Sequence, residues 1–210
     1  MLPLRSQFKH EGPNGEHVCF VFDVLGYHLD HQTAWFKHGR LPVRAVKVIT
    51  RQLLLGLDFL HRECGIIHTG TIVYPFHMSH VLVLTEPDLK PSNILLEPEN
   101  PEQTITKYLS EVPIRTETTQ SGTTIPLREV IKTPLVSEMR EPRIRIVDFG
   151  VSSWTDKHLS DRIQSPALRA PEVTIGAPWG TAIDIWSLGC LVSTPFLFMD
   201  LCSFRLNNPC

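Results

Sequence analysis

The spacing of apolar positions predicts one long helix over residues 41–64. These positions recur at steps of three and four residues, which draws a single stripe along a helix: Val46, Ile49, Leu53, Leu57 and Leu60. Pro42 suits the first helical turn, and Gly65 suits the C-terminal stop. We expect the stripe to pack in a core and not to bind a ligand.

Two other apolar runs predict strands. Residues 17–26 are rich in β-branched and aromatic side chains, end at a glycine and follow a polar turn, which is typical of a buried strand. Residues 144–147 alternate in the manner of a shorter strand. In contrast, residues 97–142 are rich in Thr, Pro, Glu and Ser and show little periodicity, so we expect a flexible, solvated segment. Its apolar part, residues 125–136, could pack locally.

Composition limits the class of protein. With 42% apolar and 20% charged residues the chain can build a core, and a net charge of −2 gives no sign of direct nucleic-acid or anionic-membrane binding. The ten histidines form no metal-binding pattern, and the five cysteines form no Cys-x-x-Cys pair, which favours a reducing compartment. No apolar run is long enough to span a bilayer. We expect a monomer without membrane contact, located in the cytoplasm, the nucleus or both.

Two short motifs carry candidate chemistry. The first is Asp88-Leu89-Lys90-Pro91-Ser92-Asn93 and the second is Asp148-Phe149-Gly150. Each alone is a weak signal, since an Asp-Leu-Lys-Pro turn can be a plain solvated loop. Together and in this order they resemble the catalytic loop and the metal-binding turn of protein kinases.

This resemblance assigns roles to the polar side chains. Phosphoryl transfer needs one carboxylate to receive the hydroxyl proton, while a carboxylate and an amide hold Mg²⁺ against the phosphates of ATP. Asp88 would be the base, and Asn93 and Asp148 would bind the metal. Lys90 would place a positive charge near the transferred phosphoryl group.

Two later blocks extend the resemblance to protein kinases. Residues 170–172 (Ala-Pro-Glu) read as the end of an activation segment, and residues 184–190 read as the buried helix that follows it. The resemblance implies that Ser165 bonds the catalytic Asp and Lys, and that Asp184 is a structural carboxylate accepting backbone N–H bonds from the catalytic loop.

The implied fold is α+β and protein-kinase-like, mainly the helical large lobe with the last strands of the small lobe. Residues 1–26 would end the small lobe and form the hinge, residues 27–192 would form a partial large lobe, and residues 193–210 would lie outside the kinase pattern. Phe22 would be the gatekeeper, and the backbone of Asp23 and Leu25 would meet adenine. A plain core strand explains the composition around Phe22 equally well.

A subgroup is indicated by three features. His68-Thr69 before the catalytic motif, the block from Gly12 to Gly26, and the long spacer before Asp148 resemble the serine/arginine-rich protein-specific kinases. The resemblance implies a protein serine/threonine kinase that uses ATP and Mg²⁺ and phosphorylates serines of Arg/Ser-rich splicing factors. Thr69 replaces an Arg usual in kinases that need activation-loop phosphorylation, which implies constitutive activity in an intact relative.

The sequence departs from the kinase pattern at residues 70–87, which separate Thr69 from Asp88. Such an insert would disturb a loop whose geometry tolerates errors of only about 1 Å. We interpret it as a retained intron translated in frame, because Gly70-Thr71 and Pro87-Asp88 can be encoded with GT and AG at the ends, and we interpret residues 193–210 as read-through.

The chain also shows no Gly-rich phosphate loop, no Val-Ala-x-Lys lysine and no partner Glu, so we expect it to be inactive or nearly so as written. Two alternatives to an enzyme remain: a pseudokinase fragment that acts as a binding module, and an unstable translation product.

Overall fold

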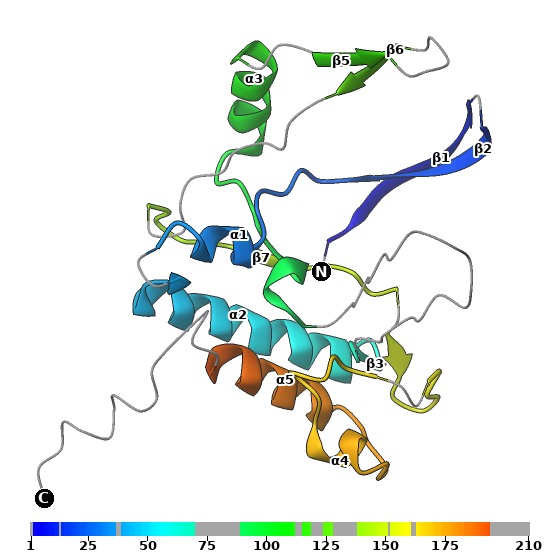
Figure 1. The fold of residues 1–210 in the computed structure, drawn as a ribbon, viewed down its shortest axis with the longest axis vertical. Coiled ribbons are helices and arrows are strands. Elements are labelled where there is room, and N and C mark those ends of the chain that lie inside the picture. The colour runs from blue at the N-terminus through cyan, green and yellow to red at the C-terminus, as the bar shows by residue number, and fades with distance from the viewer. Residues whose placement is uncertain are drawn as a thin grey trace, which may run out of the picture.

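The computed structural model describes residues 2–12, 14–36, 39–69, 89–111, 115–118, 124–127, 138–150, 152–160 and 163–193. Helices and short antiparallel strand pairs are mixed along these residues, as the α+β expectation requires (Figure 1). The strand pairs are β1 (Leu4–Gly12) with β2 (Gly15–Phe22), β3 (Ile66–Ile67) with β8 (Ser153–Trp154), β4 (Ile94–Leu96) with β7 (Ile144–Ile146), and β5 (Arg115–Thr118) with β6 (Thr124–Leu127).

The predicted long helix is confirmed as α2 (Val43–Arg62). All five residues of the apolar stripe are buried. Pro42 stands at the position before the first helical residue, and Gly65 follows the helix with φ of 63°, a left-handed conformation that glycine adopts without steric cost. The sequence pattern therefore gave both the buried face and the ends of this helix.

The main core forms where α2 meets the β4–β7 pair and two other helices, α1 (Leu29–Thr33) and α5 (Ala182–Ser193). Helices α2 and α5 lie side by side (Figure 1). The fully buried side chains of this core are Leu29, Ile49, Leu53, Leu57, Leu60, Leu89, Ile94, Leu96 and Leu191. A second, smaller cluster joins Ile67 of β3 to Ile163, Ala170 and Ile183. The helix α4 (Pro171–Thr174) lies next to it, with Val173 packed against the cluster.

The strand expected within residues 17–26 is present as β2, but its expected burial is wrong. Val18, Phe20 and Phe22 are 58%, 56% and 45% exposed. The physical reason is that β1 and β2 form a two-stranded hairpin, and among the described residues no further layer covers either face. The amino-acid composition of residues 17–26 predicted an extended backbone. It did not predict whether other elements pack on the strand.

Residues 97–142 contain regular structure where composition indicated a loop. Helix α3 (Pro101–Glu111) and the β5–β6 hairpin lie within this segment. Helix α3 has a start signal that the composition hid, because Pro101 and Glu102 open its first turn. The backbone carbonyl oxygen of Asn100 accepts the N–H of Thr104 at 2.9 Å. It has no buried residue, so the expectation of a solvated segment fits α3.

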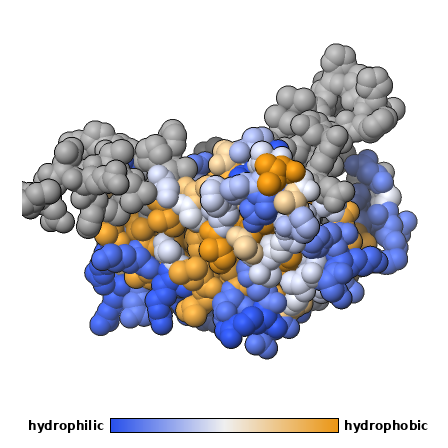
Figure 2. Space-filling view, turned by 90° about the horizontal axis from the view of Figure 1, so that it is seen from below, coloured by the Kyte–Doolittle hydropathy of each residue, from blue (hydrophilic) through white to orange (hydrophobic). Residues whose placement is uncertain are grey.

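Apolar side chains also reach the surface. Figure 2 shows a broad hydrophobic area on the face seen from below. The large exposed apolar residues of α2 and α5 are Val43, Leu54, Leu55, Phe59, Ile185 and Trp186. Among the helices that the structure describes, none combines the length and the apolar character that crossing a bilayer requires.

Truncation of two neighbouring leucines should separate the buried and exposed faces of α2. Leu53 is fully buried and Leu54 is 45% exposed. Leu53→Ala should lower the free energy of unfolding by about 2–5 kcal/mol, because it leaves a cavity in the main core. Leu54→Ala should lower it by less than about 1 kcal/mol. Urea unfolding followed by circular dichroism measures both values, and equal losses would contradict the assignment of the buried face.

Candidate functional site

The buried carboxylate of Asp184 organises the segment that precedes the candidate catalytic loop. Asp184 lies in the first turn of α5 and is 2% exposed. Its Oδ2 accepts the backbone N–H of His68 at 2.8 Å, and its Oδ1 accepts the backbone N–H of Thr69 at 3.1 Å. His61 Nε2, near the end of α2, lies 2.8 Å from Oδ2. The structural role expected for Asp184 is therefore confirmed.

The His68 ring brings the Asp-Phe-Gly turn against this anchored segment. His68 is fully buried, and its ring lies edge-on to Phe149 with 5.1 Å between the ring centroids. His68 Nε2 is 3.5 Å from the carbonyl oxygen of Val147, the residue before Asp148. Two segments that are far apart in the sequence therefore meet at His68.

The proposed metal-binding residues flank two paired strands, β4 and β7. Asn93 ends the 3₁₀ turn η2 (Pro91–Asn93) immediately before β4, and it is 7% exposed. Asp148 follows β7 after Val147. The N–H of Val147 donates to the carbonyl oxygen of Asn93 at 3.0 Å, which continues the β4–β7 ladder by one step. The pairing thus places Asn93 beside the residue preceding Asp148.

Local backbone geometry at Asp148 suits a metal ligand. Asp148 is exposed and has φ of 67°, a conformation that Asp tolerates better than most residues. A Cβ built at Gly150 would lie 3.7 Å from Asp148 Oδ1, an ordinary van der Waals contact, so the space beside the carboxylate does not itself require a glycine. An Asp carboxylate and an Asn carbonyl oxygen are hard donors of the kind Mg²⁺ prefers, with phosphates and water completing its shell. The described residues contain no cluster of three or more His, Cys, Asp or Glu residues for a metal.

Lys90 lies next to Asn93 in space and in sequence. It is half-buried and directly precedes η2, and its carbonyl oxygen accepts the N–H of Asn93 at 2.9 Å. Leu89 is 1% exposed and belongs to the main core, which anchors this turn. Asp88, the expected base, lies outside the described residues, as do the segments 70–87 and 194–210.

The expected hinge residues are attached to the same strand pair. The N–H of Gly26 donates to the carbonyl oxygen of Leu96 at 2.8 Å, and the N–H of Leu96 donates to that of Tyr27 at 3.2 Å. The Asp23 carboxylate makes two hydrogen bonds with Arg5 of β1, at 2.9 and 2.8 Å. Leu25 and Asp23 line a pocket beside the start of α3, and Phe22 ends β2.

Ser165 follows a buried glutamine that sequence reasoning missed. Gln164 is fully buried, and its amide nitrogen donates to the carbonyl oxygen of Ile183 at 2.9 Å and to Ser187 Oγ at 2.8 Å. Its Oε1 accepts the N–H of Ala170 at 2.9 Å. Ser165 itself is half-buried, and its role stays a prediction. No periodic pattern marks Gln164, and the partners Ile183 and Ser187 are distant from it in the sequence.

Comparison with known proteins agrees with this arrangement. The family described as "Protein kinase domain" matches residues 71–203, more than half of the chain. The chain belongs to the protein kinase family. The matched range begins within residues 70–87 and ends within residues 193–210, the two segments that depart from the kinase pattern. The domain boundaries therefore stay predictions.

The relatives lie in the group that the motifs indicated, which confirms the resemblance. Serine/threonine-protein kinase SRPK of Physarum polycephalum is 34% identical over 91% of this chain and 44% of its own length. Protein kinase dsk1 of Schizosaccharomyces pombe is 29% identical over 91% of this chain and 48% of its own length. SKY1 of Saccharomyces cerevisiae is 43% identical over 46% of this chain and 11% of its own length. The chain spans less than half the length of these three relatives.

Removing the Asp184 carboxylate should destabilise the protein strongly. Asp184→Ala leaves two buried backbone N–H groups without their acceptor, so the free energy of unfolding should fall by roughly 3 kcal/mol or more. Asp184→Asn keeps one acceptor oxygen and should lower the free energy of unfolding by less. Exposed Asp156 is the matched control, and Asp156→Ala should change stability by under about 0.5 kcal/mol. Thermal unfolding compares the three variants, and an unaffected Asp184→Ala would refute the anchoring role.

The ion pair with Arg5 should affect the pH at which Asp23 titrates. Hydrogen bonds from Arg5 hold the pKa of the Asp23 carboxyl below its ordinary value. The ion pair therefore stabilises the hairpin at pH above about 4, where the unfolded-state carboxyl is also ionised, and this stabilisation is lost as pH falls through the lowered pKa. NMR titration of Asp23 should show a low midpoint in the wild type that rises in Arg5→Gln. Lys9→Gln, which removes another cation from the same strand, should leave the Asp23 midpoint unchanged.

Proposed function

We propose that this chain carries the catalytic and metal-binding segments of a serine/threonine protein kinase that transfers the γ-phosphoryl group of ATP to serines of Arg/Ser-rich proteins, splicing factors among them. The observation that carries the proposal is the β4–β7 pairing, which places Asn93 beside the residue before Asp148. Membership of the protein kinase family and likeness to the kinase named SRPK support the reaction and the substrate class.

Each polar residue has a role in this proposal. Asp88 receives the proton of the substrate hydroxyl, and Lys90 places its positive charge near the phosphoryl group. Asn93 and Asp148 hold Mg²⁺, which neutralises phosphate charge when bound. Ser165 orients the base and the lysine through its hydroxyl group.

The adenine end of the nucleotide is assigned to the hinge. The backbone of Asp23 and Leu25 would bond adenine, with Phe22 beside it. The hinge is tied to Leu96 at one end of β4, and Asn93 precedes the other end. Since a strand rises about 3.3 Å per residue, the length of β4 supports a nucleotide site whose two ends lie about 10 Å apart.

We also propose that residues 70–87 impair transfer by separating the base from its anchor. Asp184 fixes the backbone at Thr69, and core packing fixes Leu89. A long insertion between two fixed points costs little stability, because loop closure entropy grows slowly with length. It does remove the direct connection between Thr69 and Asp88, and catalysis is far more sensitive to position than stability is.

Cys19, Cys64 and Cys190, the cysteines that the structure describes, form no disulfide with one another, which supports a reducing location, the cytoplasm or the nucleus.

Metal-dependent nucleotide binding tests the assignment of Asn93 and Asp148. A fluorescent ATP analogue should bind the full chain more tightly with Mg²⁺ than with EDTA. Asn93→Ala and Asp148→Ala should each reduce this Mg²⁺-dependent gain by roughly tenfold, the scale on which metal sites respond to lost partners. Asp156→Ala should keep the gain. Equal Mg²⁺ dependence in all four proteins would contradict the metal site.

The same samples should be incubated with Mg²⁺-ATP and an Arg/Ser-repeat peptide. We expect phosphate incorporation at background for the full chain. Clear incorporation that disappears in Asp88→Asn would establish the kinase activity and refute the proposed impairment. Absence of both nucleotide binding and transfer would leave the chain as a pseudokinase fragment and refute the enzyme assignment.

A further inference from the structure

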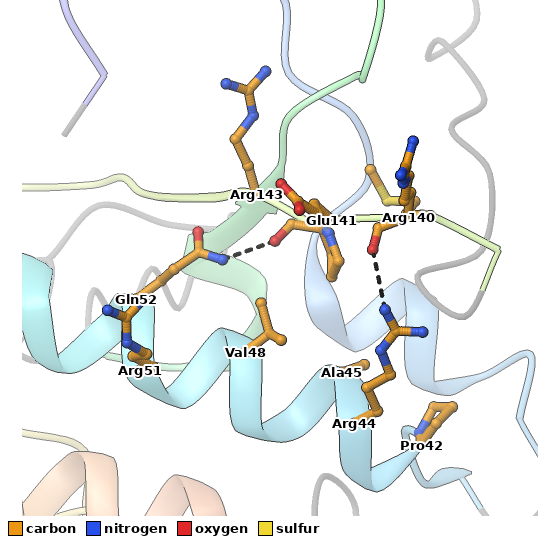
Figure 3. A pocket seen from close by; sticks show the side chains of 11 residues that line it. Pro42, Arg44, Ala45, Val48, Arg51, Gln52, Arg140, Glu141 and Arg143 are labelled. Carbon is orange, nitrogen blue, oxygen red and sulfur yellow. Dashed lines mark hydrogen bonds between the residues drawn. The ribbon is translucent and has the colours of Figure 1, made fainter.

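A groove unrelated to the metal-binding residues lies between the first half of α2 and residues 139–143, which lead into β7 (Figure 3). Gln52 of α2 holds the two sides together. Its amide nitrogen donates to the carbonyl oxygen of Pro142 at 2.7 Å, and its Oε1 accepts the N–H of Ile144 at 3.1 Å. Hydrogen bonds therefore fix the shape of the groove before any partner arrives.

The groove has apolar lining and a cationic rim. Ala45 and Val48 contribute apolar surface from α2, and Met139 and Pro142 contribute it from the opposite segment. Four arginines surround this surface, with Glu141 as the single carboxylate among the lining residues: Arg44, Arg51, Arg140 and Arg143. This is a local excess of positive charge in a chain of net charge −2.

Most of this positive charge is available to a partner. Arg143 forms an ion pair with Glu97 at 3.2 Å. Among the residues that the structure describes, Arg51 and Arg140 have exposed side chains and form no ion pair, and Arg44 donates only to the carbonyl oxygen of Arg140, at 3.5 Å. Figure 3 shows Arg44 rising from α2 toward Arg140 across the groove.

We propose that this groove docks an extended, carboxylate-rich segment of a partner protein, with aliphatic side chains between its Asp or Glu residues. Arg44 and Arg51 are two helical turns apart, about 10 Å along α2. An extended peptide covers that distance with about three residues. Aliphatic side chains between the carboxylates would cover Val48 and Met139.

Charge spacing selects carboxylates over a phosphate. One phosphate is bound best by cations that converge on it, whereas Arg44 and Arg51 are separated by two turns of α2, about 10 Å. The Arg/Ser-rich substrates proposed above are themselves basic, so the rim would repel them. The partner at this groove is therefore a different protein from the substrate, and its binding needs no ATP.

The proposal is tested by fluorescence anisotropy with the full chain. The probe is a fluorescein-labelled peptide of about twelve residues, long enough to cross the groove when extended, with Glu at every third position and Leu or Val between. Arg44→Gln/Arg51→Gln should raise its Kd by roughly tenfold or more, as expected for the loss of two charge-assisted contacts. Added salt should also raise the wild-type Kd.

A control variant should remove the same charge elsewhere. Arg62→Gln/Lys107→Gln changes one residue at the far end of α2 and one on α3, both outside the groove, and should keep the Kd within about twofold. Arg51→Gln alone is a second test, because Arg51 is exposed and its loss should not affect folding. Thermal unfolding checks that all variants remain folded.

Three results would overturn the proposal. The first is no saturable binding of the Glu peptide to the wild-type chain. The second is an equal loss of affinity in both double variants, which would indicate a general charge effect. The third is displacement of the Glu peptide by a peptide with a single phosphoserine at lower concentration than by unlabelled Glu peptide, which would assign the groove to a phosphate.

Discussion

Asp184 is buried in the first turn of α5, and its carboxylate accepts the backbone N–H groups of His68 and Thr69 and meets the ring of His61. A carboxylate at this depth is tolerated only when hydrogen bonds replace the water it has lost. The cost of burial therefore makes α5, the end of α2 and the segment after β3 depend on one another. The same contacts set the position of His68, whose ring then fixes Phe149 of the Asp-Phe-Gly turn.

The proposed metal-binding pair, Asn93 and Asp148, depends on a different kind of interaction. Asn93 and Asp148 are brought together by the β4–β7 ladder, whose Ile94, Leu96 and Ile146 pack into the main core. Burial of apolar surface thus positions polar ligands that lie at the ends of the two strands. Because Asn93 is buried and Asp148 is exposed, the pair spans the boundary between the core and the surface, where a nucleotide can reach it.

The sequence predicted those features that local patterns encode. The stripe through Leu53 and Leu57 gave the buried face of α2, and the motifs gave the family and the role of Asp184. Gln164 and Gln52 escaped prediction because their partners, such as Ser187 and Pro142, are distant in the sequence and no periodicity marks them. The exposure of β2 was not predicted for a related reason. The composition of a strand indicates its backbone conformation and not which elements cover its faces.

The arginine-rimmed groove and Asp148 lie at opposite ends of β7. Residues 139–143 form one wall of the groove, and Asp148 follows the other end of the strand after Val147. Gln52 bonds both Pro142 in the wall and Ile144, the first residue of the strand, which ties the wall to the near end of β7. A peptide seated against this wall would therefore lie at one end of β7, with Asp148 beyond the other end.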